Sequence, residues 1–518
     1  MSASREKKLR QELAASGTPD PKKVREAEEL AKQRRSNRLY GIIAVVFVVV
    51  AALLLLWNSN VIQCGTTALT IGDQKYSAAE VDYYYHAAYN SLRNNQYASY
   101  MGLDNNTDLS NTQLNDMAKM MLGVEEDMTW DAYLKDSAIK SLTQVTALSN
   151  AAKADNFTFT DEMQQDVDDS LAQIKEYASQ NGVSMNTYLK SMFGKNMNLS
   201  TLKNILKNTT LASRYEHNYV DSLTYTVDEL ESAYAEDKNS YDVVSYESIY
   251  FNGTAPNTTD ADGKSVEPTE EESAAAKEAA KTAADQALER YQNGESLEKI
   301  AEDFDMATYS NQDAATYSAS VVGEWAFDES RQANDNALLE SDPSYYLVVF
   351  HSRGRNDYNT VNVRHILFMA DSSTLDSNSD TYDQELAKLQ SMAKAKAEET
   401  LQKWKDGEAT EDSFAALATE LTEDPGSKET GGLYEEVARN QMVQTFNDWI
   451  FDESRQSGDT GIVETNYGYH VMYFVGQGAP YWQVQVRNNL RSQAYTEWTQ
   501  SLEADLTATE ASGMKYVG

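Results

Sequence analysis

The chain has 518 residues, too many for one hydrophobic core, so we expect two to four domains. Its single cysteine, Cys64, excludes an internal disulfide. Its five histidines show no metal-binding spacing, so we expect neither a metal nor another cofactor. The net charge of −37 argues against nucleic-acid binding, because an acidic surface repels phosphates.

The first expected element is a membrane anchor. Residues 1–38 carry eleven Lys and Arg against six Asp and Glu, and residues 39–57 carry no charge. A helix over 39–57 would be about 28 Å long, enough to cross a bilayer. Because positive flanks stay in the cytoplasm, we expect a basic cytoplasmic tail and a single-pass cell-membrane protein with an extracytoplasmic body. A cleaved signal peptide is one alternative, although the 38 residues before the span are long for one. A lipid-modified Cys64 is the other, although the preceding residue, Gln63, is not small.

Residues 65–236 predict a mostly helical domain. Ser77 followed by Glu80 is a capping-box pattern at the start of the first helix. Further along, Leu, Met, Ile and Tyr recur at spacings of three and four. The Met and Tyr content has two interpretations: an ordinary helical core, or a groove for unfolded chains.

Two tandem repeats follow. EWAFDESRQ (324–332) recurs as DWIFDESRQ (448–456), with seven of nine residues identical. SYYLVVF (344–350) and SYESIYF (245–251) likewise match GYHVMYF (468–474) and NVRHILF (362–368). We therefore expect two homologous α+β domains, over 240–355 and 358–478. Residues 480–518 predict a last helix, which we expect to pack on the helical domain.

The two repeats differ at two matched positions. His365 and His470 occupy the first and last strands of the second repeat, where the first repeat has Ser248 and Tyr346. Neighbouring strands can bring two imidazoles within hydrogen-bonding reach. Core packing alone does not predict the joint appearance and joint absence of the pair. A satisfied core pair and a functional pair both remain open at this point.

The second repeat resembles the parvulin-type peptidyl-prolyl isomerases, and the whole chain resembles extracytoplasmic foldases of the PrsA and SurA type. The resemblance rests on four motifs in order, VRHILF, TEDPGSKETGG, QMVQTF and ETNYGYHVMYF. It implies an α+β multidomain fold. A SurA-N/PrsA-like helical chaperone domain, completed by the C-terminal helix, would be joined to a degenerate parvulin-like domain and a PpiC-type parvulin domain.

The same resemblance implies roles for single residues. His365 and His470 match the histidine pair of the family, and Asp424 takes its Cys or Asp position. Tyr467 falls where many members have Ser or Thr, and Thr465 keeps a hydroxyl nearby. The residues expected to hold the proline ring are Leu433, Met442 and Phe446. The run GGLYEEV departs from the usual GGDLG, so we expect an altered pocket rim.

Rotation about an X-Pro bond breaks no bond, so this chemistry needs neither a nucleophile nor a metal. Residues 370–384 hold four Asp and no Lys or Arg, which argues against phosphorylated substrates. The sequence thus predicts a membrane-anchored foldase that isomerises X-Pro bonds in exported, unfolded polypeptides and also acts as a chaperone. A non-catalytic holdase and a structural cell-envelope protein are the alternatives. The first repeat, with Ser248 and Tyr346, should be catalytically silent. The sequence does not decide whether the chain forms a homodimer.

Overall fold

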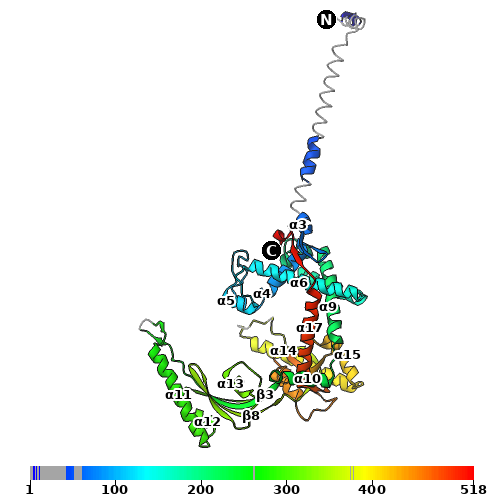
Figure 1. Cartoon of the computed structure of the whole chain (residues 1–518). Coiled ribbons are helices and arrows are strands. Elements are labelled where there is room, and N and C mark those ends of the chain that lie inside the picture. Colours follow the sequence, from blue (N-terminus) through cyan, green and yellow to red (C-terminus); the bar gives the residue numbers. More distant parts are fainter. Residues whose placement is uncertain are drawn as a thin grey trace. The chain divides into compact units, whose positions relative to one another are not determined.

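The structure is a computed structural model that describes residues 4–5, 7–8, 11, 42–51, 61–260, 263–373, 375–376 and 379–518 (Figure 1). Most of the expected tail 1–38 and of the expected span 39–57 lies outside these residues. Within the span, residues 42–51 are helical and their apolar side chains are largely exposed. Among the described residues, no helix is both long and apolar enough to cross a membrane.

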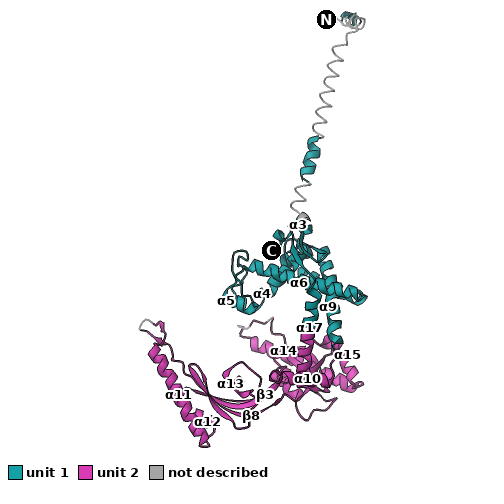
Figure 2. Cartoon of the chain, in the orientation of Figure 1, with its two compact units in different colours: residues 1–223, 495–518 teal, residues 224–494 magenta. Residues whose placement is uncertain are grey.

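The chain divides into two compact units, residues 1–223 with 495–518 and residues 224–494 (Figure 2). The first unit is mainly helical, and the predicted capping box of Ser77 and Glu80 begins its helix α4. Its small antiparallel sheet has the order β13-β1-β2, so a strand near the C-terminus pairs with the first strand of the chain. The elements are α3 (Val61–Gly65), β1 (Thr67–Ile71), β2 (Gln74–Ser77), α4 (Ala78–Arg93), α5 (Asp116–Leu122), α6 (Trp130–Ala154), α7 (Asp161–Gln180), α8 (Met185–Phe193), α9 (Leu199–Ser222), β13 (Ala508–Glu510) and η3 (Met514–Tyr516).

Helix α17 (Tyr481–Glu503) has its C-terminal part in the first unit. There Trp498 stacks on Tyr219 of α9, with ring centroids 3.9 Å apart and planes 11° apart. Trp498 and Leu502 also pack on a cluster of buried residues from α6 and α9. The indole therefore has a specific apolar partner surface within this unit.

The second unit contains two four-stranded antiparallel sheets of the same topology, β6-β3-β8-β7 and β10-β9-β12-β11. The first repeat comprises β3 (Asp242–Phe251), α11 (Glu270–Gln292), α12 (Leu297–Ala301), β6 (Ala307–Ala315), α13 (Val321–Ala326), β7 (Asn336–Ser341) and β8 (Ser344–Arg355). The second comprises β9 (Asn359–Met369), α14 (Tyr382–Asp406), α15 (Glu411–Leu421), η2 (Lys428–Thr430), β10 (Leu433–Val437), α16 (Gln444–Ile450), β11 (Thr460–Thr465) and β12 (Gly468–Pro480). The unit also holds α10 (Val227–Glu236), η1 (Lys238–Ser240), and the short strands β4 (Thr258–Thr259) and β5 (Ser265–Val266).

The central strands of the two sheets pair in equivalent registers. In the second repeat Leu367 lies opposite His470, and in the first repeat Tyr250 lies opposite Tyr346. Ser248 accordingly lies opposite Val348, just as His365 lies opposite Met472. Each position in one sheet can thus be compared directly with its counterpart in the other.

The nine-residue motif shared by the repeats has a structural role. In each copy an arginine guanidinium lies over a tryptophan ring, and an aspartate accepts hydrogen bonds from the backbone N–H and hydroxyl of the serine two residues later. The residues are Arg331, Trp325, Asp328 and Ser330 in the first repeat and Arg455, Trp449, Asp452 and Ser454 in the second. The motif therefore stabilises the turn after α13 and after α16.

Candidate active site

The second sheet separates an apolar helical layer from the face that bears the histidines. Residues of α14 and α15 pack on one face, against side chains such as Ile366 and Val471. Because side chains alternate along a strand, His365 and His470 project from the opposite face, which α16 covers through residues such as Phe446. Both histidines are buried, at 3% and 5% exposure.

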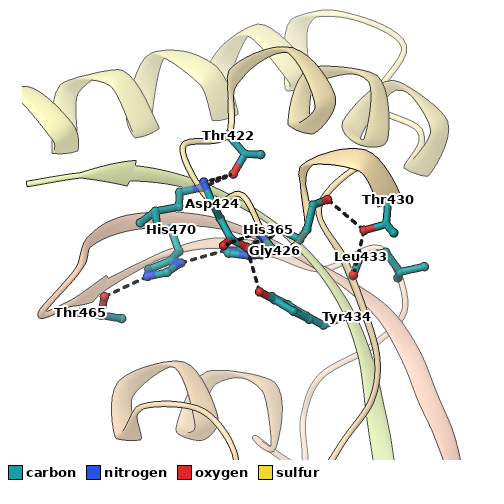
Figure 3. Close-up of polar contacts among 11 residues, drawn as sticks. His365, Thr422, Asp424, Gly426, Thr430, Leu433, Tyr434, Thr465 and His470 are labelled. Atoms are coloured by element: carbon teal, nitrogen blue, oxygen red, sulfur yellow. Dashed lines mark hydrogen bonds and ion pairs between the residues drawn. The ribbon is translucent and has the colours of Figure 1, made fainter. Parts of the chain in front are cut away.

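The two imidazoles belong to a continuous hydrogen-bonded chain of four side chains (Figure 3). Their Nδ1 atoms lie 3.0 Å apart. The Nε2 atom of His365 lies 2.9 Å from Oδ2 of Asp424, and that of His470 lies 2.9 Å from Oγ1 of Thr465. The structure therefore brings together four of the residues predicted to carry the chemistry.

Asp424 has more hydrogen-bond partners than the other three side chains of this network. Its Oδ2 also accepts hydrogen bonds from the hydroxyls of Ser427 at 2.5 Å and Tyr434 at 2.9 Å. Its Oδ1 accepts from the backbone N–H of Gly426 at 3.1 Å. These donors, with His365 foremost, hold the pKa of the Asp424 carboxyl well below its usual range.

The ionised carboxylate fixes the direction of the neighbouring hydrogen bonds. Because Asp424 can only accept, the His365 Nε2–H donates to it. Burial, aided by the nearby His365, lowers the pKa of His470 to about 3, so His470 is neutral. In the His365 tautomer that carries its proton on Nε2, Nδ1 is an acceptor, so the Nδ1–H of His470 donates to it and Thr465 donates its hydroxyl proton to Nε2 of His470. Every ring nitrogen then has a partner.

An apolar group lies beside the histidines. The Phe446 ring, 3% exposed, meets both imidazoles edge-on, with centroids 5.6 Å from His365 and 5.4 Å from His470. Met442 and Tyr434 pack in the same cluster of apolar side chains. Phe446 and Met442, the residues expected to hold the proline ring, therefore lie in one apolar cluster, and the Phe446 ring of that cluster meets both histidines.

The other two predicted side chains lie apart from this network. Leu433 precedes Tyr434 on β10, so it projects from the opposite face of the strand, and Figure 3 shows it pointing away from the histidines. Tyr434 occupies the place that we expected for Leu433. The Tyr467 phenol is 55% exposed, and only its backbone N–H reaches Oγ1 of Thr465, at 3.1 Å.

Two residues of the network escaped sequence analysis, Ser427 and Tyr434. Ser427 is 1% exposed, and its hydroxyl lies 3.1 Å from Nε2 of His365 as well as beside Asp424. The signal for Ser427 was a polar residue in a Gly-rich loop, three positions after Asp424. The signal for Tyr434 was strand alternation, which requires the register of β10.

The first repeat builds a different surface at the matching positions. Ser248 is buried, and Tyr346 packs against Tyr250 with ring centroids 5.0 Å apart. The Tyr250 and Ser344 hydroxyl oxygens lie 2.9 Å apart. The phenol pair thus stands where the second repeat has His470 and Leu367, and Ser248 stands in the place of His365.

Comparison with known proteins identifies the second repeat. Residues 345–477 match the family model described as a PPIC-type PPIASE domain, so the chain contains a PpiC-type parvulin domain. The match begins within β8, the last strand of the first repeat. Foldase protein PrsA 4 of Bacillus cereus is 37% identical over 78 residues, which cover 15% of this chain and 27% of that relative. The match thus spans about a quarter of the relative's length.

Solved structures resemble the chain more broadly but distantly. PrsA from Bacillus subtilis is 16% identical, with a TM-score of 0.29, over 73% of this chain and 89% of that chain. Foldase protein PrsA from Streptococcus pneumoniae is 13% identical, with a TM-score of 0.22, over 78% of this chain and 98% of that chain. Likenesses of this degree carry no inference about function.

Proposed function

We propose that this protein is a membrane-anchored extracytoplasmic foldase whose second repeat isomerises X-Pro peptide bonds in exported, unfolded polypeptides. One observation carries the catalytic part of the proposal. The His365–His470 pair, 3.0 Å apart and tied to an ionised Asp424, lies directly against the Phe446 ring. A polar floor beside an apolar wall suits a proline ring and its amide better than it suits a hydrolytic reaction.

For X-Pro isomerisation the protein has to supply only a partly apolar surface and correctly oriented polar groups. The barrier to X-Pro rotation is about 18–20 kcal/mol because resonance resists twisting. A twisted amide has lost resonance and polarity, so a partly dry surface formed by Phe446 and Met442 favours it over the planar ground state. The histidine pair fixes the tautomers and the orientation of the polar network beside the amide group, and it transfers no proton. His365 therefore acts as an oriented polar group and not as a general base.

An isomerisation assay on the full-length chain tests this proposal. The cis-to-trans rate of a neutral X-Pro peptide should rise with wild-type protein and fall at least tenfold in a His365→Ala/His470→Ala double variant, because the polar floor is lost. His351→Ala is the matched control, since this histidine lies in the first repeat, where its Nε2 lies 3.2 Å from Oε1 of Glu247. Equal rates for wild type and the double variant would favour the alternative that the protein is a non-catalytic holdase.

The chaperone part of the proposal is supported by exposed apolar side chains in the first unit. They gather between residues 97 and 121 and comprise Tyr97, Tyr100, Met117, Met120 and Met121. Flexible Met and amphipathic Tyr side chains adapt to varied apolar segments. The histidine double variant should therefore still suppress aggregation of an unfolded client. A structural cell-envelope protein would show no suppression with either chain.

The anchor and the location rest on the uncharged segment 39–57 and its basic flank. Protease added to intact cells should degrade the region beyond residue 65 and spare the N-terminal tail. Protection of the whole chain until the membrane is permeabilised would reverse the proposed topology.

A further inference from the structure

Tyr434 joins the polar and the apolar halves of the site. Its hydroxyl donates to Oδ2 of Asp424 at 2.9 Å (Figure 3). Its ring stacks on His365, with centroids 5.2 Å apart and planes 24° apart. The same ring packs in the cluster that contains Met442 and Phe446. A single side chain therefore touches the carboxylate, the first imidazole and the proposed proline surface.

The backbone around Tyr434 holds the ring in this place. Gly431 and Gly432 have φ values of +64° and +75°, which turn the chain sharply into β10. Tyr434 then pairs with Val363 of β9, and the register shifts before Val437. The backbone N–H of Glu436 donates to Oδ1 of Asn362 at 2.7 Å, which secures the irregular end of the strand. The orientation of Tyr434 is thus set by the sheet and does not depend on the phenol itself.

The hydroxyl of Tyr434 is a permanent donor at physiological pH. Burial, together with the hydrogen bond to the Asp424 carboxylate, raises the pKa of Tyr434 to about 12. The phenol therefore stays protonated, and Asp424 carries the negative charge of the pair. It adds to the donors from His365 and Ser427 that converge on one carboxylate oxygen. This convergence fixes the carboxylate, and the carboxylate in turn fixes which nitrogen of His365 carries the proton.

We propose that Tyr434 is a positioning residue of the isomerase site, with its hydroxyl acting through Asp424 on His365 and its ring supplying the third wall of the proline pocket. The inference rests on the proposed isomerase function. It also assigns a role to the departure of GGLYEEV from the usual run: Tyr434 supplies a wall and a donor at once.

The two halves of the proposal separate kinetically in the full-length chain. Tyr434→Phe keeps the ring and removes the donor, so kcat should fall about tenfold with KM within about twofold of wild type. Tyr434→Leu removes the ring as well, so KM should also rise several-fold. Tyr473→Phe is the matched control, because Tyr473 packs on the opposite face of the same sheet and should leave both constants unchanged.

A double-mutant cycle tests whether the hydroxyl acts through the carboxylate. In an Asp424→Asn background, adding Tyr434→Phe should change kcat by less than about twofold, since the charged acceptor is already gone. The same tenfold loss in both backgrounds would overturn the proposal, as would an unaltered kcat in Tyr434→Phe alone.

A stability measurement keeps the test independent of activity. Removing the phenol donor should raise the folded-state pKa of Asp424 towards its unfolded value, so the stability lost as the pH falls below about 4 should be smaller in Tyr434→Phe than in wild type. Identical acid unfolding curves for wild type and Tyr434→Phe would overturn the role in fixing Asp424. A wild-type chain without isomerase activity but with shifted acid unfolding would instead refute only the proposed function.

Discussion

Replacing Asp424 with alanine should unfold the parvulin domain far more easily, because buried donors would lose their acceptor. The side chains of His365 and Ser427 are almost fully buried, and both contact Oδ2 of Asp424. A buried donor left without a partner costs about 1–3 kcal/mol. The Tyr434 hydroxyl is only part-buried and can turn to water, so it adds little. The expected loss in unfolding free energy is therefore about 2–6 kcal/mol for Asp424→Ala.

The loss is best measured locally, since a chain of several domains does not unfold in one step. Hydrogen exchange of peptides covering β9 and β12 in the full-length chain reports the opening free energy of this sheet. Asp424→Asn should lose roughly half as much, because an amide oxygen still accepts. Asp371→Ala is the control: this carboxylate only caps an exposed turn, and its loss should stay within about 0.5 kcal/mol.

A loss below about 1 kcal/mol in Asp424→Ala would refute this reasoning, because it would mean that His365 and Ser427 find other partners or water at no cost. A similar loss in Asp371→Ala would point to general surface charge and not to the buried network.

Three further predictions follow from the same geometry. Gly432→Ala should destabilise the domain by about 2–4 kcal/mol in the exchange measurement, because φ is +75° there and a Cβ would collide with the His365 carbonyl oxygen. The low folded-state pKa of Asp424 contributes stability above about pH 4–5 that is lost as the pH falls towards that pKa, so thermal unfolding of wild type should become steeply acid-sensitive below about pH 4, and less so in Asp424→Asn. Ser248→His with Tyr346→His, in a chain whose second-repeat histidines are both alanine, should show no isomerase activity in the X-Pro assay.

The meeting of the two histidines could be predicted because internal repetition carries register information. The matched segments placed His365 and His470 on two strands that neighbour one another at the sheet centre. Side chains alternate between the two faces along each strand, so both histidines can project from the same face. The capping box at Ser77 and Glu80 could be read for a simpler reason: its hydrogen bonds join residues three apart and need no tertiary context.

The third side chain in the apolar cluster beside the histidines could not be placed without coordinates. Motif matching assigned Leu433, whereas the structure puts Tyr434 beside Met442 and Phe446. Side chains on a strand alternate with a period of two, so an error of one residue moves the choice to the other face. The starting point of β10 depends on the turn at Gly431 and Gly432, whose φ values are not written in the local sequence pattern.

The joint presence of both histidines in one repeat and their joint absence in the other also has a structural explanation. In the second repeat, residues 422–432 connect α15 to β10 as a loop that holds Asp424 and Ser427 beside the sheet. In the first repeat, residues 302–306 suffice to connect α12 to β6, and β6 pairs directly along β3, with Ser310 opposite Ser248.

A buried imidazole pair needs an acceptor or donor at each outer nitrogen, and an unsatisfied one costs about 1–3 kcal/mol. The shorter connection of the first repeat replaces the loop that supplies the carboxylate end of the chain. A histidine introduced at the buried Ser248 position would therefore lack that carboxylate, and its pair with a histidine at the half-buried Tyr346 position would have no fixed tautomer. The chemistry of the second repeat thus depends on the inserted loop as much as on the histidines, which is why transferring the histidines alone should transfer no activity.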